Sequence, residues 1–178
     1  MRGGFIINPQ NVSILETSFS LSPALTKEER YQQFIPLLTA YIAGETEAIS
    51  VLANVSAALH EAFHHFWVGF YLVKDANQLV LGPFQGSAAC FRIRRGRGVC
   101  GTAWAACRTQ VVPDVEQFPG HIACSSLSRS EIVVPLVQEG EVVGVLDIDS
   151  DQLNQFDETD RLYLEQVARL ITQTVSLR

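Results

Sequence analysis

Apolar residues recur at helical spacing in three stretches of the chain. Thr26 and Glu29 have the spacing of a capping box, which predicts that a helix begins directly after Thr26. A second helix is expected from about Thr46 to Phe63, and Asp157 is expected to cap a third. The apolar faces behind these predictions are, in chain order, Tyr31, Phe34, Ile35, Leu38, Tyr41 and Ile42; Ala48, Val51, Leu52, Val55, Leu59 and Ala62; and Tyr163, Val167, Leu170, Ile171 and Val175.

Between the second and third helices the pattern changes to short apolar runs that are typical of strands. Trp67–Val73 and Gln78–Leu81 predict one hairpin, and Ile132–Val137 and Val142–Ile148 predict another around the loop Glu139–Glu141. The remaining expected elements are short strands at 91–94 and 111–115 and a short helix at about 99–107.

This order of elements predicts an α+β fold. Helices at both ends would pack on a central antiparallel sheet within one domain. Residues 1–25 mix polar residues, glycines and isolated apolar residues without a period. We therefore expect an N-terminal arm of uncertain order over residues 1–25 and a single domain over residues 26–178.

The composition agrees with one folded domain and excludes several classes of protein. Of the 178 residues, 47% are apolar and 18% are charged, which is enough to bury a core. The net charge of -6, without a long basic run, argues against a nucleic-acid partner. No stretch approaches the roughly 18 apolar residues of a membrane span, and no convincing signal peptide is present. We therefore expect a cytoplasmic protein that binds no membrane.

The four cysteines are too few for a disulfide scaffold, and the cytoplasm would keep them reduced. Their spacing differs from the CxxC pattern of zinc sites, so no metal is expected. Cys100 lies in GRGVCG at the expected start of a helix, where the positive end of the helix dipole favours a thiolate. Cys90 and Cys124 each end a loop of small or polar residues and should be reachable, whereas Cys107 is expected to be a bystander.

Three carboxylates are expected to converge near the reachable cysteines. Asp147 and Asp149 lie two residues apart on a strand and therefore point to the same face. The short hairpin loop places residues whose numbers sum to about 280 opposite each other, which sets Glu131 near Asp149. Solvated acids at an exposed strand end are the ordinary explanation of such a pair. Beside a cysteine, clustered carboxylates favour a site that binds an amino group or supplies a proton.

Five motifs combine these cysteines and acids along the chain. They are GPFQGSAAC (82–90), GRGVCG (96–101), FPGHIAC (118–124), SEIVVPL (130–136) and GVLDIDS (144–150). In this order they closely resemble the motifs of the free methionine-(R)-sulfoxide reductases, a branch of the GAF domain superfamily. The resemblance extends over roughly residues 31–170 and implies one GAF-like catalytic domain. Two departures are Ser125, where the family usually has Asp, and the N-terminal arm.

The resemblance implies thiol-dependent reduction of free L-methionine (R)-sulfoxide to L-methionine, as a defence against oxidative stress. A cysteine would attack the sulfoxide sulfur and become a sulfenic acid, while Glu131 or Asp149 would protonate the departing oxygen. Family similarity favours Cys124 as the nucleophile, with Cys90 or Cys100 forming the intramolecular disulfide that thioredoxin reduces. The dipole argument makes Cys100 the alternative nucleophile. The reaction implies no bound cofactor.

A free amino acid also presents an ammonium and a carboxylate group that must be bound. Asp147 is the expected ammonium partner, with Asp114 as a second candidate. Backbone N–H groups of residues 86–90 could hold the carboxylate. Trp67 could form a wall against the S-methyl group, although packing in the core would explain this residue equally well. His121 is interpreted as structural.

The alternative function is a GAF-type sensor of a small molecule or of redox state, without turnover. Its cysteines would report the redox state, and its pocket would bind a metabolite. NADPH consumption with thioredoxin, thioredoxin reductase and free methionine sulfoxide would separate the two functions. Both allow a homodimer.

Overall fold

The computed structural model describes residues 18–122 and 124–178. The expected arm therefore lies mostly outside the described residues. In the part that is described, Phe19 is buried, and its ring lies 5.7 Å from that of Phe34 and 5.4 Å from that of Tyr41. The chain thus already packs on the first helix before residue 26. None of the helices in the described ranges is both long and apolar enough to cross a bilayer.

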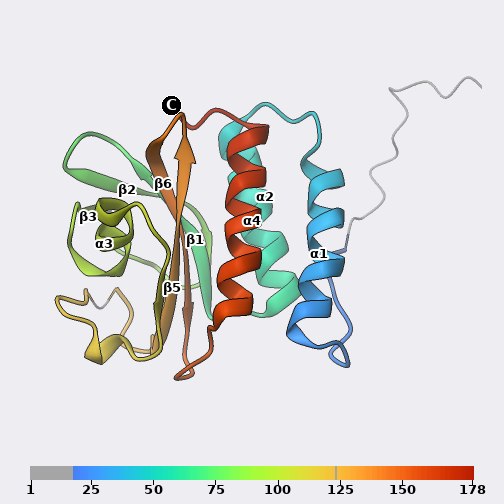
Figure 1. Cartoon of the computed structure of the whole chain (residues 1–178), viewed down its shortest axis with the longest axis horizontal. Helices are drawn as coiled ribbons and strands as arrows, with labels where there is room; N and C mark the ends of the chain where they lie inside the picture. Colours follow the sequence, from blue (N-terminus) through green and yellow to red (C-terminus); the bar gives the residue numbers. More distant parts are fainter. Residues whose placement is uncertain (1–17, 123) are drawn as a thin grey trace, which may run out of the picture.

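The described residues form a six-stranded sheet with helices on both faces (Figure 1). In chain order the elements are α1 (Lys27–Ile42), α2 (Ala48–Phe63), β1 (Trp67–Val73), β2 (Gln78–Gln85), β3 (Arg92–Arg94), α3 (Gly98–Ala106), β4 (Gln110–Val112), the 3-10 turn η1 (Val115–Gln117), β5 (Ser130–Gln138), β6 (Glu141–Ser150) and α4 (Glu158–Thr174). The strand order is β3-β2-β1-β6-β5-β4, and every pairing is antiparallel. The expected α+β fold is confirmed.

Alternating side chains give the sheet two buried faces. Val68 and Phe70 of β1 face α2 and α4, which pack directly on the sheet, while α1 packs against these two helices from outside (Figure 1). Trp67 and Tyr71 of the same strand face α3 and the long loops on the other side. The first face holds the larger core, and the second face holds the candidate site.

Residues at the starts of α1 and α4 join these two helices. The capping box of Thr26 and Glu29 is present, and Asp157 caps α4 as expected. The Lys27 ammonium contacts Asp157 at 2.8 Å and Asp160 at 2.5 Å. These contacts fix the start of α1 against the start of α4 and so hold the helical layer that supports the sheet.

Most strands differ by a few residues from their predicted bounds, and two of these differences change the course of the chain. The second strand was expected to end at Leu81, but β2 continues through Gly82 and Pro83 to Gln85. The register with β1 shifts at this point, and a proline is tolerated there because a bulge leaves one residue without a ladder hydrogen bond. At the other edge, β4 ends at Val112 because the chain turns into η1.

Candidate active site

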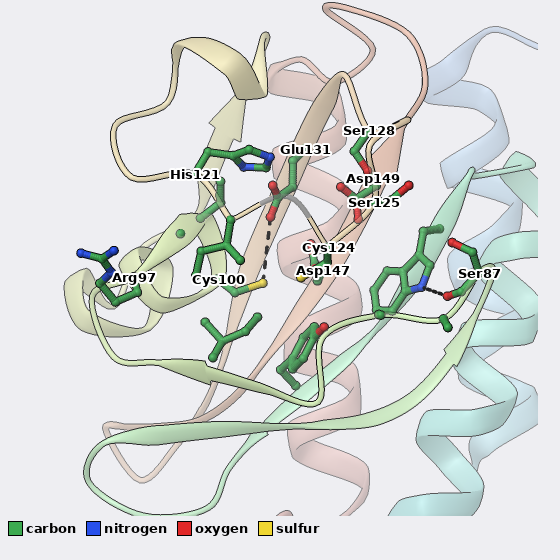
Figure 2. Close-up of a pocket in the computed structure, with 18 residues that line it drawn as sticks. Ser87, Arg97, Cys100, His121, Cys124, Ser125, Ser128, Glu131, Asp147 and Asp149 are labelled. Atoms are coloured by element: carbon green, nitrogen blue, oxygen red, sulfur yellow. Dashed lines mark hydrogen bonds between the residues drawn. The ribbon is translucent and has the colours of Figure 1, made fainter.

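A small cavity lies on the face of the sheet that carries α3 (Figure 2). Its volume is about 30 Å³, room for about one or two water molecules. The lining residues are, from the strands, Trp67, Tyr71, Ile93, Glu131, Asp147 and Asp149; from α3 and the turn before it, Arg97, Gly98, Val99 and Cys100; and from the loops, Ser87, Ala88, Ala89, His121, Ile122, Cys124, Ser125 and Ser128.

Trp67 forms one wall of the cavity and is almost fully buried. Its indole Nε1 donates a hydrogen bond to the carbonyl oxygen of Ser87 at 3.0 Å, as Figure 2 shows. A Cβ atom on Gly69 would lie 2.7 Å from the indole ring, and one on Gly86 would lie 2.6 Å from it. The two glycines therefore leave the space that the indole occupies.

Three carboxyl groups of β5 and β6 converge beside the indole, and Asp149 is the cross-strand partner of Trp67. Glu131 of β5 pairs with Asp149 of β6, which confirms the register expected from the hairpin loop. Asp147 lies two residues away on the same face of β6. Glu131 and Asp147 are each 6% exposed, whereas Asp149 is only partly buried. In the described part of the chain, Asp147 Oδ1 has no hydrogen-bond partner.

Burial raises the pKa of all three carboxyl groups, and it is the largest cause for each. Repulsion by Asp147 and Asp149 raises the pKa of Glu131 further, well above its usual range. The pKa of Asp147 is also well above its usual range, and that of Asp149 is raised to about 6. The contact between Glu131 and Asp147 raises the pKa of Glu131 and lowers that of Asp147. Burial and two neighbouring acids therefore favour the protonated form of Glu131.

Cys100 lies in the first turn of α3, with its Sγ 4.0 Å from Glu131 Oε1 (Figure 2). Burial, reinforced by Asp147 and Glu131, raises the pKa of this thiol well above its usual range. The expectation of a thiolate here is therefore wrong. A helix N-terminus contributes only about 0.3–1 kcal/mol, and the loss of water together with nearby negative charge outweighs it.

A disulfide bond joins Cys90 and Cys124, whose Cα atoms lie 5.4 Å apart. It connects the loop after β2 to the loop before β5, and Cys124 lines the cavity. The Tyr71 hydroxyl donates a hydrogen bond to the carbonyl oxygen of Cys90 at 3.0 Å. Cys100 remains a free thiol in the cavity wall, and Cys107 is exposed at the end of α3, outside the cavity.

One predicted binding residue lies elsewhere. The Asp114 side chain accepts a hydrogen bond from the Glu116 backbone N–H at 3.0 Å and so caps η1, outside the cavity lining. In this structure Asp114 does not line the cavity, and its contact with the substrate ammonium group stays a prediction. A turn-forming role explains this aspartate, because a short side chain before a turn readily bonds to the backbone two residues on.

The sequence reasoning missed several residues of the cavity. His121 was interpreted as structural, yet it lines the cavity, its Nδ1 has no partner among the described residues, and burial lowers its pKa. Tyr71 could have been found from strand alternation, because it lies four residues after Trp67 on the same face. Ser128 also lines the cavity, but it lies in a loop where apolar and polar residues do not alternate regularly. The hydroxyl-rich sequence around it was the one sequence signal for this residue.

The cavity also contains a geometry that a cation could use. Ligand atoms of Cys100, Glu131 and Asp147 lie within 4.8 Å of one another. The bond lengths of a tetrahedral zinc ion place its sulfur and oxygen ligands about 3.5 Å apart. The distances between the three ligand atoms would therefore have to shorten before they could bind such an ion. A cation would also compete with protons for these atoms. The cluster can therefore hold a proton, an ammonium group or a metal ion, but not all of them together.

Comparison with known proteins gives the family of the chain. A family model described as GAF domain matches residues 46–176. GAF domain-containing protein A of Dictyostelium discoideum is 60% identical over 146 residues, which are 82% of this chain and 92% of that protein. Free methionine-R-sulfoxide reductase of Escherichia coli is 46% identical over 153 residues, which are 85% of this chain and 92% of that enzyme.

A solved structure agrees with these relatives. The X-ray structure of free methionine-R-sulfoxide reductase from Neisseria meningitidis, in complex with its substrate, superposes with a TM-score of 0.84 at 54% identity. The match covers 87% of this chain and 93% of that chain. By sequence and by fold, the chain belongs to the free methionine-R-sulfoxide reductase family of GAF domain proteins.

Proposed function

We propose that this protein reduces free L-methionine (R)-sulfoxide to L-methionine. The observation that carries the proposal is that a disulfide-forming cysteine pair, of which Cys124 lines the cavity, lies beside three clustered carboxyl groups whose pKa burial raises. Sulfoxide reduction needs both parts, because thiols supply two electrons and an acid supplies a proton to the departing oxygen. The relatives named above support the same substrate.

The cysteine chemistry assigns a role to each member of the pair. Cys124 attacks the sulfoxide sulfur, the sulfur–oxygen bond breaks, and the oxygen is transferred to Cys124 as a sulfenic acid while methionine leaves. The Cys90 thiol then attacks the Cys124 sulfur, which forms the disulfide and releases water. Cys90 is favoured over Cys100 for this second step because its Cα lies 5.4 Å from that of Cys124 and it forms the bond in the structure.

The carboxyl groups divide the remaining work. Glu131 is the proton donor to the sulfoxide oxygen, because burial and the two neighbouring carboxyl groups raise its pKa and so favour its protonated form. Asp149, with a pKa of about 6, is mostly ionised at neutral pH. Its negative charge raises the pKa of Glu131 and so helps that group to keep its proton. Asp147 binds the substrate ammonium group, which would supply the partner that its Oδ1 atom lacks among the described residues.

Other parts of the cavity complete substrate binding. The Trp67 indole borders the space that the S-methyl group would occupy, and residues 87–89 line the cavity where backbone N–H groups could hold the substrate carboxylate. The disulfide is then reduced by an external dithiol protein such as thioredoxin, without a bound cofactor. Such recycling suits the reducing environment of the cytoplasm.

One coupled assay tests the function. The protein is mixed with NADPH, thioredoxin reductase, thioredoxin and free L-methionine (R)-sulfoxide, and NADPH oxidation is followed. We expect turnover of this epimer but little with the (S) epimer or with the N-acetylated substrate, which lacks an ammonium group. Cys107→Ser, which changes an exposed cysteine outside the cavity, is the matched control for Cys124→Ser and should keep full activity.

The same assay separates the enzyme from a redox sensor. An enzyme releases one methionine per Cys90–Cys124 pair when the reduced protein meets substrate without reductant. A sensor would show oxidation of the pair by general oxidants but no methionine release and no NADPH oxidation above background. That result would replace the proposed enzyme with the sensor.

A further inference from the structure

Exposed apolar side chains flank the Cys90–Cys124 disulfide. Phe91, the residue after Cys90, is 79% exposed, more than any other large apolar side chain in the described ranges. Leu127, three residues after Cys124, is 62% exposed. The disulfide holds the two segments with Cα atoms 5.4 Å apart. Both side chains therefore fall within the area that one docked protein covers, about 800 Å² per partner.

A basic hollow adjoins the same region. Arg92, Arg94 and Arg97 surround it together with Ile122, and its volume is about 540 Å³. Arg97 and Ile122 also line the cavity, so the hollow adjoins the cavity. Among the residues that the structure describes, none of these arginines takes part in an ion pair. This positive patch lies on a protein whose net charge is -6.

We propose that Phe91, Leu127, Arg92 and Arg94 form the docking surface for the protein that reduces the disulfide. The partner would be a small dithiol reductase of the thioredoxin type, with an apolar surface and acidic residues beside its reactive thiols. This inference rests on the proposed function, because an enzyme that turns over needs its disulfide reduced in every cycle.

The chemistry requires such contact. A thiolate of the partner attacks one sulfur of the Cys90–Cys124 bond, that bond breaks, and a mixed disulfide joins the two proteins. The second thiol of the partner then attacks the mixed disulfide, so that this chain recovers two thiols and the partner becomes the disulfide. During the mixed disulfide the partner must lie against the residues next to Cys90 and Cys124.

The type of side chain favours a protein over a small thiol as the reductant. A small thiol needs neither an exposed phenylalanine nor an exposed leucine, whereas the centres of protein interfaces are enriched in aromatic side chains that docking removes from water. Unpaired arginines at the rim attract an acidic partner and increase its association rate. The two features point to the same occupant.

Two double variants test the surface, one apolar and one basic. Phe91→Asp/Leu127→Asp removes the apolar contact, and Arg92→Glu/Arg94→Glu reverses the charge; none of these residues lines the cavity. We expect each to lower kcat/KM for thioredoxin at least tenfold. Turnover with dithiothreitol and the single release of methionine by the reduced protein should stay unchanged. Added salt should slow wild-type reduction by thioredoxin more than that of the charge-reversed variant.

Matched controls lie away from the disulfide. Ile49→Asp changes an apolar residue of α2 that is 62% exposed, as Leu127 is. Arg108→Glu/Arg169→Glu reverses two exposed arginines that border a separate groove beside α4. Both controls should keep wild-type kinetics with thioredoxin. Circular dichroism of all variants checks that they fold.

Three results would overturn the inference in distinguishable ways. Unchanged thioredoxin kinetics in both test variants, with turnover by dithiothreitol intact, would reject the docking surface and leave the proposed function standing. Unchanged kinetics with an altered oligomeric state of Phe91→Asp/Leu127→Asp would assign the apolar side chains to an interface between copies of the chain. No methionine release by the wild-type protein with dithiothreitol would reject the proposed function and this inference with it.

Discussion

The carboxyl groups of the site reduce the stability of the fold. An acid whose pKa is higher in the folded than in the unfolded state stabilises the fold only while it is protonated, so its contribution is lost as the pH rises. Glu131, Asp147 and Asp149 all have raised pKa values, and each therefore costs stability at neutral pH. Groups with this property are concentrated in functional sites, which agrees with the chemistry proposed here.

Glu131 and Asp147 should respond differently to loss of charge. Glu131→Gln removes the proton donor and should lower kcat about 100-fold or more, with a small effect on KM. Asp147→Asn removes the ammonium partner and should raise KM for the sulfoxide about 10- to 100-fold, because charged hydrogen bonds contribute about 1.5–3 kcal/mol. Steady-state kinetics with the (R) epimer measure both.

Thermal unfolding provides the control for these two variants. Each substitution removes a buried acid from a repelling cluster, so the melting temperature at pH 7.5 should be equal to or higher than that of the wild type. Loss of activity with a retained melting temperature would assign the effect to chemistry. If Asp147→Asn lowered kcat and Glu131→Gln raised KM instead, the two roles would have to be exchanged.

At the scale of elements, strand alternation and hairpin length made much of the site predictable. Glu131 and Asp149 are brought together by one hairpin, and their pairing follows from a loop of three residues. The Cys90–Cys124 contact is different, because it joins two loops that are 34 residues apart and have no period. Family resemblance offered Cys90 and Cys100 as partners of Cys124, and only the folded chain distinguishes them.

Two expectations differ from the structure for related physical reasons. The thiolate at Cys100 was inferred from its place at a helix start, but its pKa depends on burial by elements from the whole fold. Asp114 was expected on a strand that reaches residue 115, whereas β4 ends at Val112 and the chain turns. Local patterns predict the secondary structure well, but burial depth and loop course depend on tertiary packing.

The packing of β1 against β2 leads to a prediction about Gly69. A Cβ atom at this position would clash with Phe84 Cβ in β2 and would lie 2.7 Å from the Trp67 ring. Gly69→Ala should therefore destabilise the protein by about 1–3 kcal/mol, because overpacking forces strands and side chains to move. It should also lower activity by displacing the indole that lines the cavity. Urea unfolding and the coupled assay measure the two effects.

Gly120→Ala is the control for this substitution. Gly120 has a positive φ of 74°, but a Cβ atom added there would meet no described atom within 4 Å, so only local backbone strain is added. Its destabilisation should be smaller than that of Gly69→Ala, and Trp67 fluorescence should change only in the Gly69 variant. Equal fluorescence spectra for both variants would contradict the proposed support of the indole by Gly69.

At the scale of the whole molecule, the helical side of the sheet contains its own pH-sensitive group. His65 is 8% exposed, its ring stacks near Phe63 and Phe156, and its Nε2 has no partner among the described residues. Burial, followed by nearby positive charges, lowers its pKa to about 3. Because the unfolded chain takes up this proton near pH 6.5, stability is lost as the pH falls from about 6.5 towards 3.

His65→Phe should remove this loss. When the pH falls from 7.5 to 5, the free energy of unfolding of the wild type should decrease by about 2 kcal/mol more than that of the variant. Urea unfolding at both pH values measures the difference, and contributions of the carboxyl cluster cancel because both proteins contain it. His60→Gln, on the exposed side of α2, removes one of the positive charges that lower the pKa of His65, and it should reduce the difference between the pH values only slightly because burial is the largest cause. If the wild type and His65→Phe differed in free energy of unfolding by the same amount at both pH values, the role of His65 would be rejected.

On the opposite side of the sheet we expect oxidation to control access of the substrate. With the Cys90–Cys124 bond closed, the cavity has a volume of only about 30 Å³, too small for an amino acid. Reduction removes the covalent link between the loop that carries Cys124 and the loop that carries Cys90, so we expect the site to enlarge in the reduced protein. A ligand that binds only one of two states shifts the equilibrium towards that state.

L-Methionine, the product, tests this coupling without reacting. Isothermal titration calorimetry should detect its binding to the reduced wild-type protein and at least tenfold weaker binding to the oxidised protein. Cys90→Ser cannot form the bond with Cys124 and should therefore bind methionine equally in oxidising and reducing buffer. Cys107→Ser, which keeps the Cys90–Cys124 pair, should behave as the wild type. Equal affinity of the oxidised and reduced wild type would show that the closed bond does not block the site, and the product would then need no change of redox state to leave.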